Sequence, residues 1–336
     1  MTGAPLALSL GDPAGIGPEI TAKAWAALRE TGPRFMVIGD ATLLASTSRA
    51  GGAGIRRVGS PSEVHTVFKT AIPVLDVPLA APVVSGKPAA AHGPAIIRCI
   101  ETGVGLALSG AVSGLVTAPI AKAPLYEAGF KFPGHTEFLA ELTLDETYDG
   151  ARGPVMMLVA GGLRVSLVTI HEPLARVAAL LSVDKIVNAG LCTAQALRRD
   201  FGIARPRLAV AGLNPHAGES GALGREEVEI IAPAVAALRA QGVNAKGPYP
   251  ADTLFHEDAR AAYDAVLCMY HDQALIPVKM LDFWSGVNVT LGLPIVRTSP
   301  DHGTGFDIAG RGQARPDSLI AAIRLAAEIA KRRIAA

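Results

Sequence analysis

The sequence predicts an α/β protein with a largely parallel sheet, two domains and an active site in the cleft between them. Short apolar runs alternate with longer stretches rich in alanine, leucine and charge, the pattern of parallel strands connected by helices. The 336 residues, half of them hydrophobic, suffice for about two cores. Glycine and proline mark many strand ends rather than one hinge, so we expect a discontinuous division: residues 1–130 with 291–336, and residues 131–290.

The individual elements follow from local patterns. Strands are expected at the apolar runs LALSL, FMVIG (35–39), IPVLDV (72–77), PVMMLVA, LRVSLVTI, RLAVAGL and DAVLCMY. Helices are expected where apolar residues recur every three or four positions, most clearly over 183–200, 224–241 and 316–334. The uncharged run 103–121 contains glycines, serines and a proline. It therefore predicts a helix end, a turn over 109–114 and a short strand over 115–117 rather than a membrane span.

Composition excludes several classes of protein. Thirty-one basic residues balance thirty acidic ones without clustering, so neither nucleic acid nor a membrane surface is an expected partner. Three cysteines without a CxxC motif predict neither a disulfide framework nor a cysteine metal site. The amino terminus lacks the pattern of a signal peptide, and we expect a cytoplasmic enzyme. The low charged fraction, 18%, suits an oligomer, with a dimer as the simplest case.

Three histidines follow apolar strands: His171 in LVTIHEP, His216 in AGLNPHAGE and His271 in MYHDQ. Strand ends in an open α/β sheet are where ligands bind. Each histidine alone is more often a hydrogen-bonded structural residue, but three imidazoles that converge there would hold zinc or a similar divalent ion and leave a position for substrate.

Two segments suggest anion binding at helix starts. In GDPAGIGPEI (11–20), glycines precede a helix that begins near Pro18, although a simple strand-to-helix turn explains the spacing about as well. In GHTEFLA (134–140), Thr136 is expected to cap a helix, with His135 exposed just before it. A phosphate or carboxylate there would meet both side chains.

Further polar residues stand among apolar ones near the expected cleft. Lys279, Asn288 and Arg297 are spaced about nine residues apart, and the two cations would bind an anionic substrate. Asp272, beside His271, is either an outer partner of a metal ligand or a proton acceptor. Asp252 either caps a helix or serves the site.

The loop DHGTGFDIAG (301–310) is punctuated by glycines. Gly303, Gly305 and Gly310 would permit close approach of a flat ligand, and Asp307 could accept hydrogen bonds from a ribose. By itself this pattern is only weakly specific.

The chain resembles the PdxA family of vitamin B6 synthesis at nearly all these motifs. The resemblance runs from GDPAGIGPEI through VTAPIAK, GHTEF, LNPHAGE, PADTLF, MYHDQ and GVNVTLGLP to RTSPDHGT and DIAGRG. GDPAGIGPE and DHGTGFDIAG also resemble the wider isocitrate and isopropylmalate dehydrogenase group, and this implies that group's two-domain fold. The first domain would then bind cofactor, and the second would carry the metal ligands and the dimer interface.

The resemblance implies an NAD- or NADP-dependent homodimer that oxidises 4-phosphooxy-L-threonine at C3. Loss of carbon dioxide then gives 3-amino-2-oxopropyl phosphate. One divalent ion, zinc, magnesium or cobalt, would activate the hydroxyl and polarise the ketone. The resemblance assigns the metal to His171, His216 and His271, in a site built from both subunits. It assigns substrate binding to five residues, His135, Thr136, Lys279, Asn288 and Arg297.

The remaining roles are less specific. We expect Asp272 or Lys279 to accept the proton, Asp252 to lie near the metal, and Gly303, Thr304 and Asp307 to contact the cofactor. The loop departs from the family pattern at Gly305, which leaves the choice between NAD and NADP open.

Three other functions fit the same residues. A dehydrogenase of the same fold could act on a phosphorylated sugar acid or an aromatic cis-dihydrodiol carboxylate. A metal-dependent hydrolase would use the histidines without a dinucleotide. A non-catalytic protein that binds phosphorylated acids would need neither the metal nor Asp272.

Overall fold

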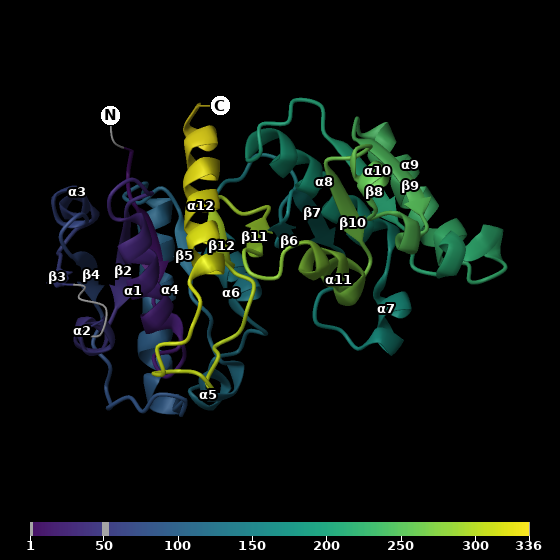
Figure 1. Cartoon of the computed structure of the whole chain (residues 1–336). Helices are drawn as coiled ribbons and strands as arrows, with labels where there is room; N and C mark the ends of the chain where they lie inside the picture. The colour runs from purple at the N-terminus through teal and green to yellow at the C-terminus, as the bar shows by residue number, and fades with distance from the viewer. Residues whose placement is uncertain (1–2, 49–53, 336) are drawn as a thin grey trace. The chain divides into compact units, whose positions relative to one another are not determined.

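The structure is a computed structural model that describes residues 3–48 and 54–335. It confirms the α/β class (Figure 1) and divides into two compact units: residues 1–146 with 294–331, and residues 147–293 with 332–336. The expected boundaries were 130 and 290. Residues 131–146 group with the first unit, where the ring of Phe138 packs on those of Phe130 and Phe132, each centroid 5.0 Å away.

The first unit contains a parallel sheet in the strand order β3-β4-β2-β1-β5-β12. Its strands are β1 (Leu6–Ser9), β2 (Phe35–Gly39), β3 (Ile55–Arg57), β4 (Ile72–Asp76), β5 (Leu115–Thr117) and β12 (Arg297–Pro300). Four of the six strands, β1, β2, β5 and β12, are fully buried runs, as parallel strands covered on both faces should be. β5 occupies the three residues that the sequence predicts.

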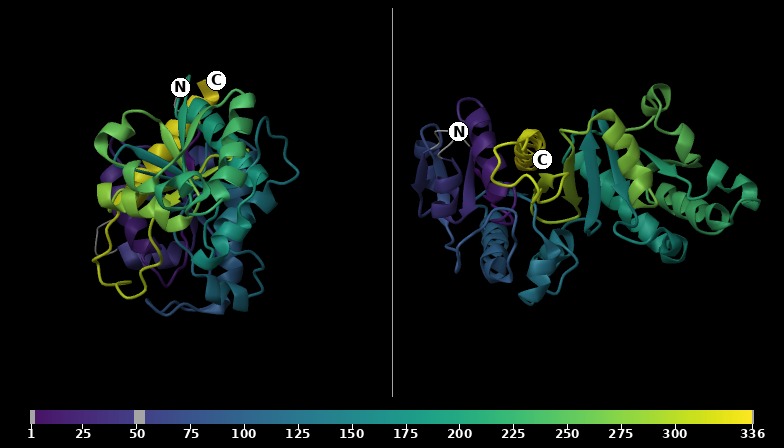
Figure 2. Two further views of the ribbon diagram at one scale, coloured as in Figure 1. Left: turned by 90° about the vertical axis from the view of Figure 1, so that its right-hand side faces the viewer. Right: turned by 60° about the horizontal axis from the view of Figure 1, so that its bottom comes forward.

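The helices of the first unit connect these strands: α1 (Gly17–Leu28), α2 (Ala41–Ser48), α3 (Val64–Val67), α4 (Gly93–Leu108), α5 (Lys122–Glu127), α6 (His135–Leu142) and α12 (Asp317–Ala335). Proline stands in the first turn of α1 and of α4, where its missing N–H costs no hydrogen bond. α12, the long yellow helix in Figure 2, is anchored to β12 by the Thr298 hydroxyl, which donates to the carbonyl of Ala322 at 2.8 Å.

The second unit contains a mixed sheet in the order β11-β6-β7-β10-β8-β9. Its strands are β6 (Val155–Ala160), β7 (Leu163–Leu167), β8 (Arg207–Ala211), β9 (Asn244–Tyr249), β10 (Ala265–Cys268) and β11 (Val287–Leu291). β6 runs antiparallel to β7 and to β11, and the other pairs are parallel. The tight turn at Gly161 and Gly162, both with positive φ, allows the β6–β7 hairpin.

The helices of the second unit are α7 (Leu174–Leu180), α8 (Val183–Arg199), α9 (Ala232–Ala240), α10 (Glu257–Arg260) and α11 (His271–Leu281). Short turns complete it: η4 (Pro215–Gly221), the π-helical η5 (Glu227–Ile231) and η6 (Ala251–Thr253). The predicted helix over 224–241 is thus two elements, a π-helical turn followed by an α-helix.

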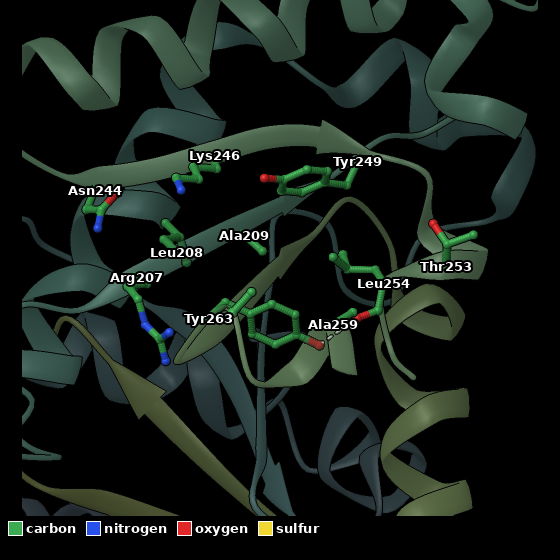
Figure 3. Close-up of a pocket in the computed structure, with 11 residues that line it drawn as sticks. Arg207, Leu208, Ala209, Asn244, Lys246, Tyr249, Thr253, Leu254, Ala259 and Tyr263 are labelled. Carbon is green, nitrogen blue, oxygen red and sulfur yellow. Dashed lines mark hydrogen bonds between the residues drawn. The ribbon is translucent and has the colours of Figure 1, made fainter. Parts of the chain in front are cut away.

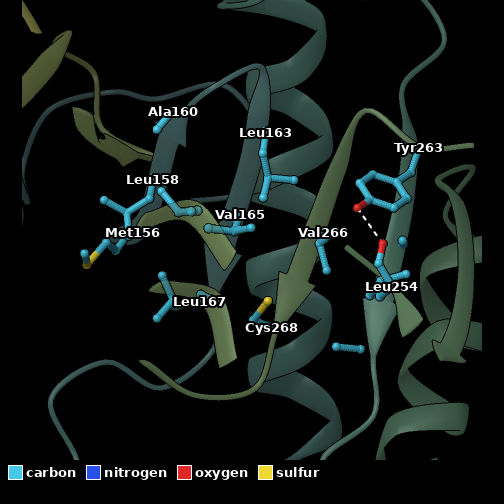
Figure 4. Close-up of a cluster of buried hydrophobic side chains, with 14 residues drawn as sticks. Met156, Leu158, Ala160, Leu163, Val165, Leu167, Leu254, Tyr263, Val266 and Cys268 are labelled. Carbon is cyan, nitrogen blue, oxygen red and sulfur yellow. Dashed lines mark hydrogen bonds between the residues drawn. The ribbon is translucent and has the colours of Figure 1, made fainter. Parts of the chain in front are cut away.

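Alternate side chains of four strands form a buried core on one face of this second sheet (Figure 4). Leu158, Val165 and Val266 are fully buried there, and Ala274 and Val278 of α11 pack against them. Each buried valine or leucine contributes about 1.5–3 kcal/mol. This packing fixes α11, and therefore its first residue, His271, at the end of β10.

Among the described residues, no single helix is long and apolar enough to cross a bilayer. Within residues 3–48 and 54–335, one pair of helices, α7 and α8, meets the length and composition requirement when taken together, and their axes meet at 93°. Cys99, Cys192 and Cys268 are buried free thiols, in agreement with the expected absence of a disulfide framework.

Candidate functional site

Two of the three predicted metal ligands lie side by side in the second unit. The ring centroids of His171 and His271 are 5.7 Å apart, with 43° between the ring planes. The chain brings them together because the segment after β7 is bound to the segment after β10. The Thr169 N–H and hydroxyl both donate to the carbonyl of Met269, at 3.2 and 2.7 Å.

His271 is oriented by its neighbour. Its Nδ1 lies 2.7 Å from Oδ1 of Asp272, which leaves Nε2 as the nitrogen that would bind a metal. A carboxylate on the outer ring nitrogen fixes the tautomer and raises the basicity of the ligand. Of the two roles expected for Asp272, this contact supports the outer partner.

The spacing of the two rings suits a shared divalent ion. Ligand nitrogens lie about 2.0–2.1 Å from zinc, so two imidazoles on one tetrahedral ion have centroids about 5 Å apart. The observed 5.7 Å is close to that separation. Two imidazoles with a carboxylate behind one of them therefore form a donor set that fits zinc or cobalt.

His216 is not part of this pair. No three His, Cys, Asp or Glu side chains among residues 3–48 and 54–335 form a group that could hold a metal ion. His216 is exposed, and its Nδ1 lies 3.8 Å from Oε2 of Glu219. One chain thus brings together two of the three expected ligands.

The backbone around His216 is a left-handed turn. Five consecutive residues, His216 to Ser220, have φ between 44° and 76°, and only Gly218 among them is a glycine. A left-handed turn costs roughly 1–2 kcal/mol for each residue that has a Cβ. The residue types of His216, Ala217, Glu219 and Ser220 do not predict this conformation. The surrounding contacts must therefore impose it.

The buried carboxylate of Glu227, on η5, makes those contacts. Its Oε1 accepts the backbone N–H groups of Leu213 and Asn214, both at 2.7 Å, and its Oε2 accepts from the Asn214 amide at 2.9 Å. A Cβ on Gly218 would lie 2.5 Å from Oε2, so the turn also needs a glycine at that position. Glu227 stands in the charged run REEVE, a pattern that predicts an exposed side chain rather than a buried one.

Gln273 connects the segments of the second unit that lead to His216 and to His271. Its Oε1 accepts the N–H of Met269, two residues before His271, and its Nε2 donates to the carbonyl of Gly212, four residues before His216. Both distances are 2.7 Å, and Gln273 is buried. Sequence reasoning missed this residue as well.

The first unit contains a buried cation. Arg297, at the start of β12, is buried, and its Nη2 donates to Oγ1 of Thr117 at 2.6 Å. Burial lowers its pKa to about 10, an effect that the charge of Glu137 partly offsets. The guanidinium therefore stays protonated at neutral pH, and a buried positive charge of this kind favours an anion beside it.

His135 lies close enough to feel that charge. Burial, followed by the positive charge of Arg297, lowers the pKa of His135 well below its ordinary value, so the ring is neutral at pH 7. Its Nε2 is shielded from solvent, and no described group forms a hydrogen bond to it. No described group therefore occupies this nitrogen, and contact of His135 with a ligand stays a prediction.

The expected cap at Thr136 is wrong, and of the two roles left open for Asp252 the structure does not show the capping one. α6 begins at His135 itself after Gly134, and Thr136 lies inside the first turn and does not cap it. The extended backbone of Gly134 moves the helix start one residue earlier, so His135 is partly buried rather than exposed. Asp252 lies within η6, which follows Pro250 and has no side-chain cap. Its carboxylate is exposed.

Lys279 and Asn288 belong to the second unit. Lys279 is partly buried on α11, with Nζ 5.2 Å from the centroid of the Phe283 ring. Asn288 lies on β11 opposite Leu158, and its Oδ1 is buried with no hydrogen-bond partner among the described residues. That Lys279, Asn288 and Arg297 line one pocket stays a prediction.

The glycine-rich segments of the first unit do come together. The N–H of Ile16, in GDPAGIGPEI, donates to the carbonyl of Thr304 at 2.9 Å, and a Cβ on Gly15 would lie 2.8 Å from the same oxygen. Gly303 and Asp307 are exposed beside this contact. The close backbone approach explains Gly15 structurally and leaves an open loop surface for a flat ligand.

One cavity of the second unit lies outside the predicted site. It has a volume of about 240 Å³ and lies among β8, β9, η6 and α10 (Figure 3). Two of its polar groups are already paired: the Arg207 guanidinium lies 3.0 Å from Asp264, and the Tyr263 hydroxyl donates to the carbonyl of Leu254 at 2.8 Å. None of the predicted site residues lines this cavity.

The lowered pKa of His135 predicts a pH dependence of stability. The unfolded chain binds a proton at this ring below about pH 6.5, whereas the folded chain does not. The free energy of unfolding should therefore fall as pH drops below that value, by at most about 1.4 kcal/mol per pH unit from this group. Urea unfolding of the wild type and of His135→Gln at several pH values measures the slope. His135→Gln should lose this pH dependence of the free energy of unfolding. His256→Gln, which changes an exposed histidine, should keep it. Equal slopes in all three proteins would contradict the argument from the burial of His135.

Comparison with known proteins places the chain among close relatives. The family model described as pyridoxal phosphate biosynthetic protein PdxA matches residues 32–326. A 4-hydroxythreonine-4-phosphate dehydrogenase of Caulobacter vibrioides is 74% identical over 333 residues, which cover 99% of each chain.

Solved structures agree with this grouping. The 4-hydroxythreonine-4-phosphate dehydrogenase of Klebsiella pneumoniae is 43% identical, with a TM-score of 0.86 over 97% of this chain and 99% of that one. A terephthalate 1,2-cis-dihydrodiol dehydrogenase of Burkholderia xenovorans LB400 is 33% identical, with a TM-score of 0.64 over 97% and 98% of the two chains. The wider fold therefore supports oxidation of more than one class of substrate.

Proposed function

Because the chain belongs to the PdxA family of pyridoxal phosphate biosynthetic proteins, we propose that it oxidises 4-hydroxythreonine 4-phosphate at C3 with NAD or NADP. Decarboxylation to 3-amino-2-oxopropyl phosphate follows. The observation that carries the proposal is the His171–His271 pair with Asp272 behind it, a donor set for the divalent ion of this chemistry. When bound, the nicotinamide accepts the hydride and the ion acts as a Lewis acid on the C3 oxygen.

Residues of this chain would do the rest. Arg297 and the neutral His135 bind the phosphate, with Thr136 in the same helix turn, and Lys279 and Asn288 hold the remainder of the substrate. Asp272 already contacts His271, which supports Lys279 as the group that takes the hydroxyl proton. Asp252 is assigned a place near the metal, and Gly303, Thr304 and Asp307 are assigned to the cofactor.

The third metal ligand is proposed to be His216 of the partner subunit. Within one chain His171 and His271 are adjacent and His216 stands apart on an exposed turn. A homodimer that exchanges this turn would complete two identical sites. Such a cytoplasmic dimer needs no nucleic acid or membrane partner.

An exposed apolar surface on α11 and the residues after it supports the dimer. It consists of Ile276, Met280, Leu281, Phe283 and Trp284, which are 39–82% exposed. A contiguous apolar patch of this kind marks an interaction site. It adjoins His271 in sequence, so an interface there would lie next to the metal ligands.

Met280→Asp should therefore convert the dimer to a monomer, because the most exposed of these side chains, at 82%, would place a charge in the interface. Sedimentation velocity of the wild type and the variant measures the change. Val84→Asp, an exposed apolar residue of the first unit, is the matched control. A monomeric wild type, or a Met280→Asp variant that remains dimeric, contradicts the proposal.

A spectrophotometric assay tests the activity itself. Purified protein with a divalent metal, NAD or NADP and 4-hydroxythreonine 4-phosphate should produce reduced nicotinamide, and a chelator should abolish the signal until metal is restored. Reduction only with a sugar acid phosphate or a cis-dihydrodiol carboxylate would transfer the assignment to a relative of the same fold. No reduction with any substrate would favour a hydrolase or a binding protein.

A further inference from the structure

We propose that Glu227 is a positioning residue: its buried carboxylate holds the left-handed turn His216–Ser220 and thereby presents the His216 imidazole as a metal ligand. This inference rests on the proposed function, in which His216 binds the metal. It concerns a residue that touches neither metal nor substrate within the chain. The evidence is the set of contacts that Glu227 makes with the segment before His216.

The first step is the cost of burying Glu227. It is 3% exposed, and a buried carboxylate must be compensated by donors. The groups that donate hydrogen bonds to it belong to two adjacent residues. They are the Leu213 N–H, the Asn214 N–H and the Asn214 side-chain amide, at 2.7–2.9 Å. The carboxylate thus replaces the hydrogen-bond acceptors that this irregular segment lacks.

The second step is the strain of the turn. Four residues with a Cβ adopt φ values between 44° and 58°, a conformation that an isolated chain avoids. Glu227 lies against the turn and against the segment that leads into it: Oε2 would lie 2.5 Å from a Cβ on Gly218 in the turn, and Oε1 would lie 3.1 Å from a Cβ on Gly212 before it. Both glycines leave room for the carboxylate, so the turn is built around it.

The third step is the element that carries Glu227. It is the first residue of η5, a π-helical turn over Glu227–Ile231. Single π-helical turns inside helices are rare and occur frequently at functional sites, because the inserted residue changes where side chains point. Here the irregularity accompanies a glutamate that faces the protein interior, while its neighbours Val228 and Glu229 are exposed.

The experiment compares wild type, Glu227→Gln and Glu229→Gln in the full chain. The glutamine keeps the size of the side chain but turns an NH2 group toward donor groups that need an acceptor. Glu229 lies two residues away and pairs with Arg225 at the surface, so Glu229→Gln is the matched control. Hydrogen exchange of the metal-free protein and calorimetric titration with zinc are the two measurements.

Glu227→Gln should lose exchange protection at Leu213 and Asn214 and should bind zinc about 10–100-fold more weakly, the range seen when an outer partner of a metal ligand is removed. Saturating zinc should restore its kcat, because no catalytic group is lost. Glu229→Gln should behave as wild type. If Glu227→Gln does not fold, Gly218→Ala, which places a methyl group against the carboxylate, should weaken zinc binding in the same way.

If the wild type binds zinc tightly and Glu227→Gln binds it equally tightly, the inference about Glu227 is wrong while the proposed function stands. A wild-type protein that binds none of zinc, magnesium and cobalt contradicts the proposed function, and the inference with it. The exchange data separate the two cases, since they report on the turn without metal.

Discussion

His271→Ala should lose its divalent metal and fall in kcat by on the order of 1000-fold. The substitution removes one imidazole of the His171–His271 pair and leaves Asp272 without the ring that it orients. Lewis-acid stabilisation by a bound metal amounts to several kcal/mol, and each 1.4 kcal/mol is about tenfold in rate. Metal content by mass spectrometry and kcat at saturating substrate measure the two losses.

The matched control is His256→Ala, which changes an exposed histidine outside the pair. It should keep metal and activity. Full metal content and near-normal kcat in His271→Ala would remove this histidine from the site. Loss of metal in both variants would point to general instability instead.

Arg297→Met should lower kcat/KM by roughly 30- to 4000-fold, since truncation of a buried group that pairs with a charged ligand costs about 2–5 kcal/mol. The stability of the folded protein, by contrast, should not decrease. Burial lowers the pKa of Arg297 to about 10 because it removes the guanidinium from water, and a methionine of similar length avoids that desolvation. The melting temperature without ligand should be equal to or above that of the wild type.

Inorganic phosphate offers a readout that does not depend on turnover. It should raise the melting temperature of the wild type and leave that of Arg297→Met unchanged. Arg207→Met is the control, because Arg207 is exposed and already paired with Asp264. Equal stabilisation of Arg297→Met by phosphate would contradict anion binding at Arg297.

Much of the fold could be predicted because its signals are local. Buried parallel strands appear as apolar runs, and β2 and β5 occupy the residues that the runs FMVIG and LVT predict. The same logic placed His171 and His271 after strands β7 and β10, and the backbone pairing of those strands brings the rings together. The apolar runs therefore predict the positions of these two histidines.

The rest of the site depends on contacts that no local pattern encodes. Glu227 looks like part of a solvated acidic run, and only the fold buries it against Leu213 and Asn214. The left-handed turn contains one glycine among five residues, so its conformation is imposed by tertiary contacts. Thr136 was expected to cap α6 because it is a common capping residue, yet Gly134 allows the helix to begin before it.

The discontinuous course of the chain has a consequence for the order of folding during synthesis. All six strands of the second unit lie between Val155 and Leu291, so the sheet of that unit is complete in sequence before β12 emerges. β12 must then pair with β5, and the hydrogen bond between Arg297 and Thr117 joins residues 180 positions apart. Pairings of such long range form slowly. The buried charge expected to recognise phosphate is therefore put in place late, so a nascent chain that ends before residue 297 already contains all three histidines but lacks this charge.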